Sequence, residues 1–163
     1  MTRATLAERL ARADLPGFDT SAAPPAPAGR YVAVRVAAGI AYVSGQMPRT
    51  TGGSLLAGSD LDAGADLAYA SARLAMANAL AQVVACAHIR DVLGVVRVTG
   101  YFVGLGGMAL APALDGASDL VAEVFGGEAG AHARAVLACA TLPGGAAVEL
   151  VVEVECTPAF GIG

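Results

Sequence analysis

The sequence contains no lysine and no tryptophan, and charged residues make up only 15% of its 163 residues. Arginine supplies all of the basic side chains, and the formal net charge at pH 7 is -4. Nucleic-acid-binding surfaces depend on clustered lysine and arginine side chains, and no such cluster is present. This composition disfavours nucleic acid as a partner.

Long hydrophobic runs are also missing. The two longest uncharged runs, residues 74–89 and 98–114, are shorter than the ~20 residues that a membrane-spanning helix needs. Charged side chains recur through the first fourteen residues, which leaves no apolar stretch for the core of a signal peptide. We therefore expect a cytoplasmic protein with no membrane partner.

Cysteine is scarce as well. Cys86, Cys139 and Cys156 are an odd number, lie far apart and lack the spacing of metal ligands. We expect them to be small buried hydrophobic residues, and we expect no metal site.

Hydrophobic residues, in contrast, make up 56% of the chain, and its length suits a single domain. One explanation is the alanine content, which adds hydrophobicity without large side chains. The other is that apolar surface is covered by association of subunits. We expect an oligomer.

Hydrophobic periodicity and turn residues predict the secondary structure. The elements are a helix over 5–14, strands over 31–37 and 40–44, a long helix over about 59–88, a strand over 92–103, a helix over 118–125, and strands over 134–141 and 146–156. Thr5 and Glu8 have the spacing of a capping box, and Ala38-Gly39 is typical of a tight hairpin turn. The prolines of residues 23–27 favour an extended connector.

After the short N-terminal helix, this β-β-α-β-α-β-β order predicts an α+β sandwich with both helices on one face of a mixed sheet. The long helix carries apolar residues at helical spacing: Leu67, Ala70, Leu74, Ala77, Ala81 and Val84. In the last strand one face has Val148, Leu150, Val152 and Val154, and the other has Glu149, Val151, Glu153 and Glu155. The strand over 92–103 is apolar on both faces, which predicts a central position. The helix-free face of the sheet is expected to close a small ring of subunits.

Arg134 lies among alanine and valine in a C-terminal third that has few charges, and we place it and Glu149 at neighbouring strand ends. Burying a charge costs several kcal/mol per ion, so a lone arginine there indicates an anionic ligand, with an interface salt bridge as the alternative. If the last two strands formed a plain hairpin, Arg134 would face residues 153–155 and not Glu149. The sheet order that would bring Arg134 and Glu149 together stays open.

The chain resembles a known family. The residues that carry the resemblance are Tyr31 after the proline-rich lead, YVSGQMP at 42–48, VVRV at 95–98, Ala133-Arg134, Leu142-Pro143 and Val148-Glu149. Their order and spacing are similar to those of the Rid superfamily, the reactive enamine/imine deaminases also called YjgF-like or endoribonuclease L-PSP. The resemblance covers a core over about residues 24–156 of one domain, 1–163, with the N-terminal helix and linker in 1–23. The stretches DGASDL at 115–120 and GAHAR at 130–134 resemble a divergent branch.

This resemblance implies a chorismate-mutase-like fold and a homotrimer with three clefts between subunits. It also implies that water hydrolyses short-lived 2-imino or enamino acids, such as 2-aminoacrylate, to 2-keto acids and ammonia. The implied partner is a small carboxylate-bearing metabolite, and no cofactor is required.

Two charged residues match the family's catalytic residues. Arg134 matches the carboxylate-binding arginine, whose planar guanidinium can hold a carboxylate by two parallel hydrogen bonds. Glu149 matches the glutamate that orients or deprotonates the attacking water. Alternatively, Glu149 simply pairs with Arg134.

Four further residues are implied to line the site and to bind substrate or water. Ser44 and Gly45 end a strand, where glycine lets a backbone N–H approach a ligand, and Gly45 is implied to help bind the substrate carboxylate. The Val136 carbonyl is implied to help hold the water. Tyr31 matches a tyrosine that lines the cleft, with interface packing as its alternative.

His132 shares a strand face with Arg134 and is either a branch-specific acid or base or a structural histidine. The chain also departs from the typical family pattern. Ser118 and Val121 stand where the second helix usually has an asparagine and a tyrosine, and Val136 stands where cysteine is common. These changes alter the shape of the cleft and leave the arginine in place.

Two other functions compete with deamination. The first is a trimeric protein that binds a small carboxylate in the same clefts without turnover. The second, endoribonuclease activity, is weaker, because an acidic chain with two histidines offers little affinity for phosphate.

Overall fold

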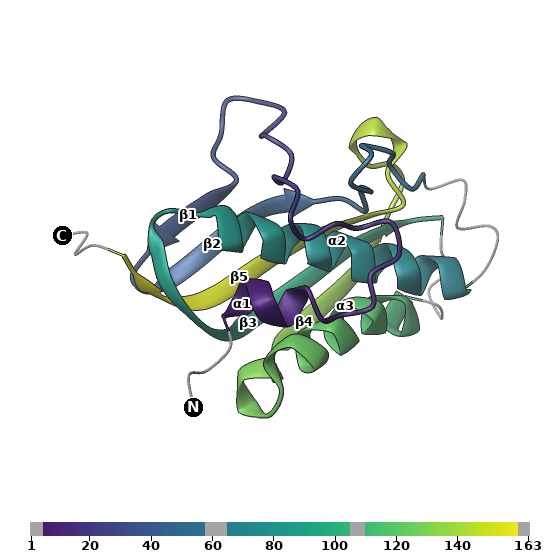
Figure 1. The fold of residues 1–163 in the computed structure, drawn as a ribbon. Helices are drawn as coiled ribbons and strands as arrows, with labels where there is room; N and C mark the ends of the chain where they lie inside the picture. Colours follow the sequence, from purple (N-terminus) through teal and green to yellow (C-terminus); the bar gives the residue numbers. More distant parts are fainter. Residues whose placement is uncertain (1–4, 58–64, 105–109, 160–163) are drawn as a thin grey trace.

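The computed structural model describes residues 5–57, 65–104 and 110–159. Within these ranges, five strands form one mixed sheet, and helices α2 and α3 cover one of its faces (Figure 1). The elements are α1 Leu6–Leu10, β1 Val34–Ala37, β2 Ile40–Gln46, α2 Ala65–Ala85, β3 Ile89–Val103, α3 Leu110–Phe125, the short 3-10 turn η2 Glu128–Gly130, β4 Ala133–Cys139, the 3-10 turn η3 Pro143–Gly145, and β5 Val148–Pro158. The predicted α+β class and element order are confirmed.

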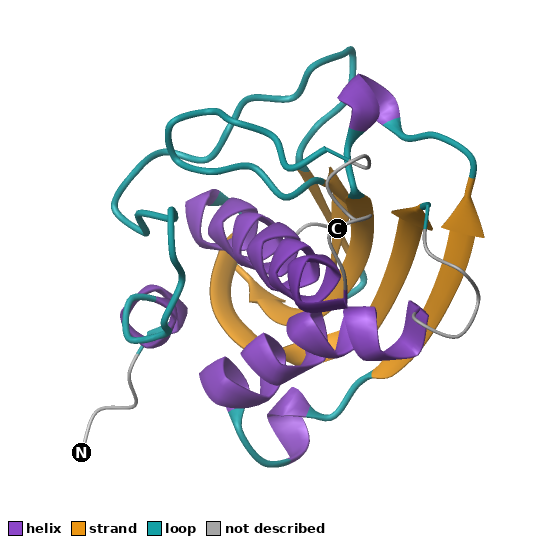
Figure 2. Cartoon of the chain, turned by 90° about the vertical axis from the view of Figure 1, so that its right-hand side faces the viewer, coloured by secondary structure: helices purple, strands orange, loops and turns teal. Residues whose placement is uncertain are grey.

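The strand order in the sheet is β1-β2-β5-β3-β4. Strand β5 runs antiparallel to both of its neighbours, β2 and β3, whereas β4 pairs with β3 in parallel at the edge. Figure 2 shows the helices on one side of this curved sheet and open strands on the other. The last two strands therefore do not form a hairpin, and the central strand is β5, with β3 beside it.

The first two strands do form the predicted hairpin. Its turn residues Ala38 and Gly39 both have positive φ angles, 49° and 78°. This is the geometry that matches the right-handed twist of paired strands, and glycine adopts it without strain.

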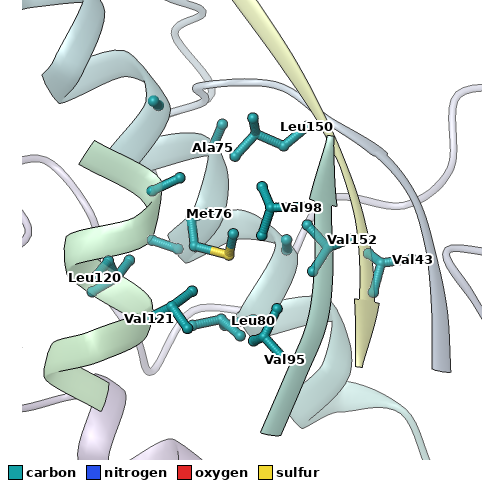
Figure 3. Close-up of a cluster of buried hydrophobic side chains, with 14 of the residues drawn as sticks. Val43, Ala75, Met76, Leu80, Val95, Val98, Leu120, Val121, Leu150 and Val152 are labelled. Atoms are coloured by element: carbon teal, nitrogen blue, oxygen red, sulfur yellow. The ribbon is translucent and has the colours of Figure 1, made fainter. Parts of the chain in front are cut away.

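The hydrophobic core lies between the sheet and the two helices (Figure 3). Met76 and Leu80 of α2 and Leu120 of α3 point toward Val98 of β3 and Val152 of β5. The predicted alternation of the last strand is confirmed, because its inward residues are fully buried: Val148, Leu150, Val152 and Val154.

Helix α2 differs from its predicted apolar stripe. Ala70 and Val84 are exposed, while nearly every residue from Ser71 to Val83 is buried. The reason is that α3 packs along one side of α2 while the sheet packs against another. The buried residues of α2 include the polar side chains Ser71, Asn78 and Gln82. Among the described residues, no helix has both the length and the apolar character needed to cross a membrane.

Several element boundaries differ from the predictions. Helix α1 ends at Leu10 instead of residue 14, and α2 ends at Ala85 instead of 88. The predicted start of the long helix, 59–64, lies outside the described residues. Helix α3 begins at Leu110, eight residues before the predicted start at 118, because Pro112 lies in its first turn, where no backbone N–H is needed.

The predicted capping box at the N-terminus is present. The Thr5 hydroxyl accepts a hydrogen bond from the Glu8 backbone N–H, and the Thr5 N–H donates to the Glu8 carboxylate. The hydrogen bond from the Thr5 backbone N–H to the carboxylate is the main cause that lowers the pKa of Glu8. Arg9 then attaches α1 to the end of α3: its Nη1 donates to the Val124 carbonyl at 3.1 Å, and its guanidinium lies 5.0 Å from the centre of the Phe125 ring.

Helices α2 and α3 are in close contact at Gly116. A Cβ atom at this position would lie 2.0 Å from the Tyr69 carbonyl oxygen, which is backbone and cannot rotate away. We predict that Gly116→Ala lowers the free energy of unfolding by about 1–3 kcal/mol, because α3 must move off α2. Denaturant unfolding measures this. Gly52→Ala, where a Cβ meets nothing closer than 3.9 Å, is the control and should change stability by less than about 0.5 kcal/mol.

Candidate functional site

A bulge in β2 shapes the surroundings of Ser44 and Gly45. Val43 pairs with Val152 and Gln46 with Leu150, so two residues of β2 lie opposite the single Val151 of β5. The Ser44 hydroxyl donates to the Val32 carbonyl at 2.8 Å, and the Ser44 N–H donates to the Ala33 carbonyl at 2.9 Å. Bulges often re-aim groups next to functional sites, and this one turns residue 45 toward β5.

The structure brings Gly45 and Glu149 together. A Cβ at position 45 would lie 1.7 Å from Glu149 Oε1, so the carboxylate occupies the space that any side chain would need. Gly45 does not have a positive φ angle, so the backbone conformation does not require glycine here. Glycine is required because a side chain would collide with the Glu149 carboxylate. Glu149 is half-buried, and no arginine or histidine of the described ranges forms a salt bridge with it.

Tyr31 and Gly45 line the same small pocket, of about 70 Å³. The proline-rich connector forms one wall of it, and Arg49 also contributes. The Tyr31 hydroxyl accepts a hydrogen bond from the Ala28 N–H at 3.3 Å. One chain therefore places Tyr31 and Gly45 on the same pocket.

Two buried polar residues of α2 complete this pocket, and neither was among the site residues predicted from the sequence. Gln82 Nε2 donates to the Pro25 carbonyl at 2.8 Å, and Asn78 Nδ2 donates to the Arg49 carbonyl at 2.9 Å. They fix the connector and the loop after β2 against the helix. The sequence does contain a signal for them, because two amide side chains occur within a helix made largely of alanine and other apolar residues. Buried amides need hydrogen-bond partners, so such amides indicate a contact between the helix and another segment.

Arg134 is not a lone charge. Its Nη1 lies 2.6 Å from Asp115 Oδ1 and 3.0 Å from Ser118 Oγ, both on α3. The two charged side chains are 35% and 47% exposed. The expectation of an isolated arginine is therefore wrong, because α3 begins early enough to place Asp115 beside β4. Within the described ranges, Arg134 Nε and Nη2 have no hydrogen-bond partner.

His132 joins the same cluster and shares a face with Arg134, as predicted. Its Nδ1 lies 2.9 Å from the Gly130 carbonyl and its Nε2 lies 3.0 Å from Ser118 Oγ. Because a carbonyl only accepts, the neutral ring carries its proton on Nδ1, and Nε2 accepts from the Ser118 hydroxyl. Ser118 Oγ therefore accepts from Arg134 and donates to His132.

The two groups of site residues lie on opposite faces of the sheet. Arg134 and Val136 pair with Val98 and Gly100 of β3 and face α3 and the core, whereas Glu149 alternates with buried neighbours and faces away from the helices. Strand β3 also separates β4 from β5. The expectation of neighbouring strand ends is therefore wrong, and one chain does not bring Arg134 and Glu149 together.

Cys139 lies within the electrostatic reach of Glu149. Burial raises the pKa of its thiol, and the Glu149 charge raises it further. Its Sγ donates to the Phe102 carbonyl at 3.4 Å, so this cysteine is a protonated thiol at neutral pH and a poor nucleophile. Across the described residues, no group of three histidine, cysteine, aspartate or glutamate side chains is placed to hold a metal ion.

Comparison with known families agrees with this fold. Residues 9–154 match the family model described as "YjgF/chorismate mutase-like, putative endoribonuclease". The chain belongs to the YjgF family. Its sequence and structural similarity to the proteins described next extends over most of this chain and most of theirs.

Three similar proteins illustrate this. Protein TCP17 of Trypanosoma cruzi is 35% identical over 136 residues, 80% of this chain and 83% of its own. A solved structure described as a putative endoribonuclease from Shewanella oneidensis has a TM-score of 0.76 at 30% identity and covers 93% of this chain and 99% of its own. Escherichia coli TdcF with bound serine shares the fold, with a TM-score of 0.61 at 20% identity over 83% of this chain and 94% of its own.

The contact between residues 45 and 149 predicts an energetic coupling. Gly45→Ala should lower stability by about 1 kcal/mol, because the Glu149 carboxylate must move away from the new methyl group. In a Glu149→Ala background the same substitution should cost at least about 0.5 kcal/mol less. Denaturant unfolding of the four proteins in this cycle measures the coupling. Glu153→Ala, on the same strand face, is the matched control, and equal relief by that variant would contradict the contact.

Proposed function

We propose that this protein is a cofactor-independent hydrolase that deaminates reactive 2-imino and enamino acids, such as 2-aminoacrylate, to 2-keto acids and ammonia in clefts between subunits. The observation that carries the proposal is the half-buried carboxylate of Glu149, which lies against Gly45 and has no salt-bridge partner among the described residues. Membership of the YjgF family and the serine bound by the structurally similar TdcF support a site for small amino-acid-like carboxylates.

The proposed reaction needs only water and two side chains. Arg134 binds the substrate carboxylate through its open Nε/Nη2 edge. Glu149 accepts a proton from water as the water oxygen attacks C2 of the protonated imine, which gives a tetrahedral carbinolamine. That proton then passes from Glu149 to the nitrogen. The C–N bond breaks and ammonia leaves as the C=O bond of the keto acid forms, while the proton of the hydroxyl group returns to the Glu149 carboxylate and from there passes to ammonia, which leaves as ammonium. An enamino acid must first be protonated at C3 to become the imine.

Because Arg134 and Glu149 face opposite sides of the sheet, the proposal requires a site completed by more than one subunit. The helix-free face carries exposed apolar residues of three strands, Tyr42, Leu137 and Val151. Exposed apolar area of this kind is typical of a face that another subunit covers. We propose that this face forms a homotrimer and that each cleft receives its arginine and its glutamate from different protomers.

An imine-trapping assay tests the activity. Imines released by an amino-acid oxidase react with semicarbazide, and the purified protein should lower the yield of semicarbazone by hydrolysing them first. Glu149→Gln should reduce the rate about 10²–10⁴-fold because it removes the general base. Arg134→Ala should reduce it about 10–100-fold because it removes charge-assisted hydrogen bonds. Arg90→Ala, an exposed arginine paired with Asp91, is the control and should have no effect.

Failure to accelerate imine loss for any amino acid in a panel would contradict the deaminase proposal. Recovery of an unchanged bound carboxylate would instead support the binding protein, and cleavage of RNA by a nuclease-free preparation would support the endoribonuclease.

Mixed oligomers test whether the site is composite. When Arg134→Ala and Glu149→Gln protomers are coexpressed with different tags, hetero-oligomers should regain activity, since some clefts receive both native residues. Random mixing in a trimer restores about a quarter of the clefts. If purified hetero-oligomers stay as inactive as the parent variants, the two residues do not come from different protomers.

A charge on the helix-free face tests the oligomer. Val151→Glu should convert trimers to monomers in sedimentation velocity, because a carboxylate would be buried in the interface without a partner. Val84→Glu is the matched control, since Val84 has a similar exposure, 43% against 38%, and lies on α2. A monomeric native protein, or dissociation by both variants alike, would contradict this interface.

A further inference from the structure

The Arg134–Asp115 pair is an electrically neutral unit with one open edge. Asp115 and Ser118 both engage Nη1, and in the described part of the chain Nε and Nη2 have no partner. A guanidinium has five N–H donors, so a ligand carboxylate can bind the Nε/Nη2 edge in a bidentate way while Asp115 stays in place. A ligand bound there is separated from the Asp115 carboxylate by the guanidinium group and by one hydrogen bond on each side of it.

The charge of the ligand then decides how well it binds. A simple carboxylate meets a guanidinium whose charge Asp115 already balances, and it also experiences the negative charge of Asp115. An amino or imino acid carries a cationic nitrogen next to its carboxylate, and this nitrogen can face Asp115. The attraction of that nitrogen to Asp115 offsets the repulsion that its carboxylate experiences.

The polar atoms of the other two members of the cluster, Ser118 and His132, are directed at partners within the chain. Ser118 Oγ is shared between Arg134 and His132, and His132 Nδ1 is directed at the Gly130 carbonyl. Asp115, with 47% of its side chain exposed, is the group of this cluster that can respond to a positive charge on a ligand.

We infer that Asp115 makes the site selective for zwitterionic 2-imino and 2-amino acids over simple carboxylates. The inference rests on the proposed function, in which Arg134 binds the substrate carboxylate. It also gives a reason for product release: hydrolysis replaces the cationic C=NH₂⁺ group by a neutral C=O, so the keto acid loses its attraction to Asp115 while its carboxylate is still repelled. Asp115 is thus a specificity-determining residue and not a proton donor or acceptor in the reaction.

Equilibrium binding of L-alanine and L-lactate to the full-length protein tests this, because the two ligands differ only in an ammonium or a hydroxyl group. Titration calorimetry at constant pH and salt should give about five- to tenfold tighter binding of alanine to the native protein. Asp115→Asn should abolish or reverse that preference by weakening alanine and strengthening lactate. Ser118→Ala, which keeps the charge of Asp115, should retain the preference.

Asp119→Asn is the matched control, since Asp119 lies one turn further on α3 and accepts a hydrogen bond from Tyr69. It should leave both affinities unchanged, and Arg134→Ala should abolish binding of both ligands. Equal affinity of the native protein for alanine and lactate, or an equal change of both in Asp115→Asn, overturns the inference. Absence of alanine binding that depends on Arg134 overturns it too.

Turnover in the imine-trapping assay separates this inference from the proposed function. Loss of selectivity with turnover intact contradicts the role of Asp115 alone. Selective binding of alanine without turnover contradicts the deaminase and leaves the role of Asp115 standing.

Discussion

Consecutive side chains of β5 point to opposite faces of the sheet, and helices cover only one of those faces. This alternation decides where the polar groups lie. Val148 and Leu150 are fully buried under α2, so Glu149 between them must face away from the helices. A register slip of one residue in β5 would bury that carboxylate and expose two core residues. The core therefore fixes the position of Glu149 more firmly than any hydrogen bond does.

Much of the fold could be predicted from the sequence because its signals are local. The capping box at Thr5, the Ala38-Gly39 turn and the alternation of β5 each depend on a few adjacent residues. The burial of α2 on two sides could not be predicted, because it depends on α3 packing against it at Gly116, forty-seven residues after Tyr69. The start of α3 was missed because Pro112 is usually a helix breaker and is tolerated only in a first turn.

The candidate site was predictable to a smaller extent. Family motifs identified Gly45 and Glu149, and the structure explains their combination, since the glycine leaves room for the carboxylate. The partner of Arg134 was not predictable. Asp115 reaches it only because β4 pairs in parallel with β3 and lies under α3. The pairing of β3 with β4 is a long-range contact, and hydrophobic periodicity within each segment does not indicate it. The same strand order places Arg134 and Glu149 on opposite faces.

Each half of the proposed site is held in place before any subunits meet. The space at Gly45 holds the Glu149 carboxylate, while α3 supplies two oxygens that orient the Arg134 guanidinium. In the proposed oligomer, subunit association would align two groups that are already ordered, which spares the entropy of fixing long side chains at the moment of binding. A free arginine would be ordered only by its ligand and would bind simple anions indiscriminately. Under the proposed function, the pairing of Arg134 with Asp115 therefore has two effects. It holds the guanidinium in one position, and it makes the site selective for ligands that carry a cationic nitrogen beside the carboxylate.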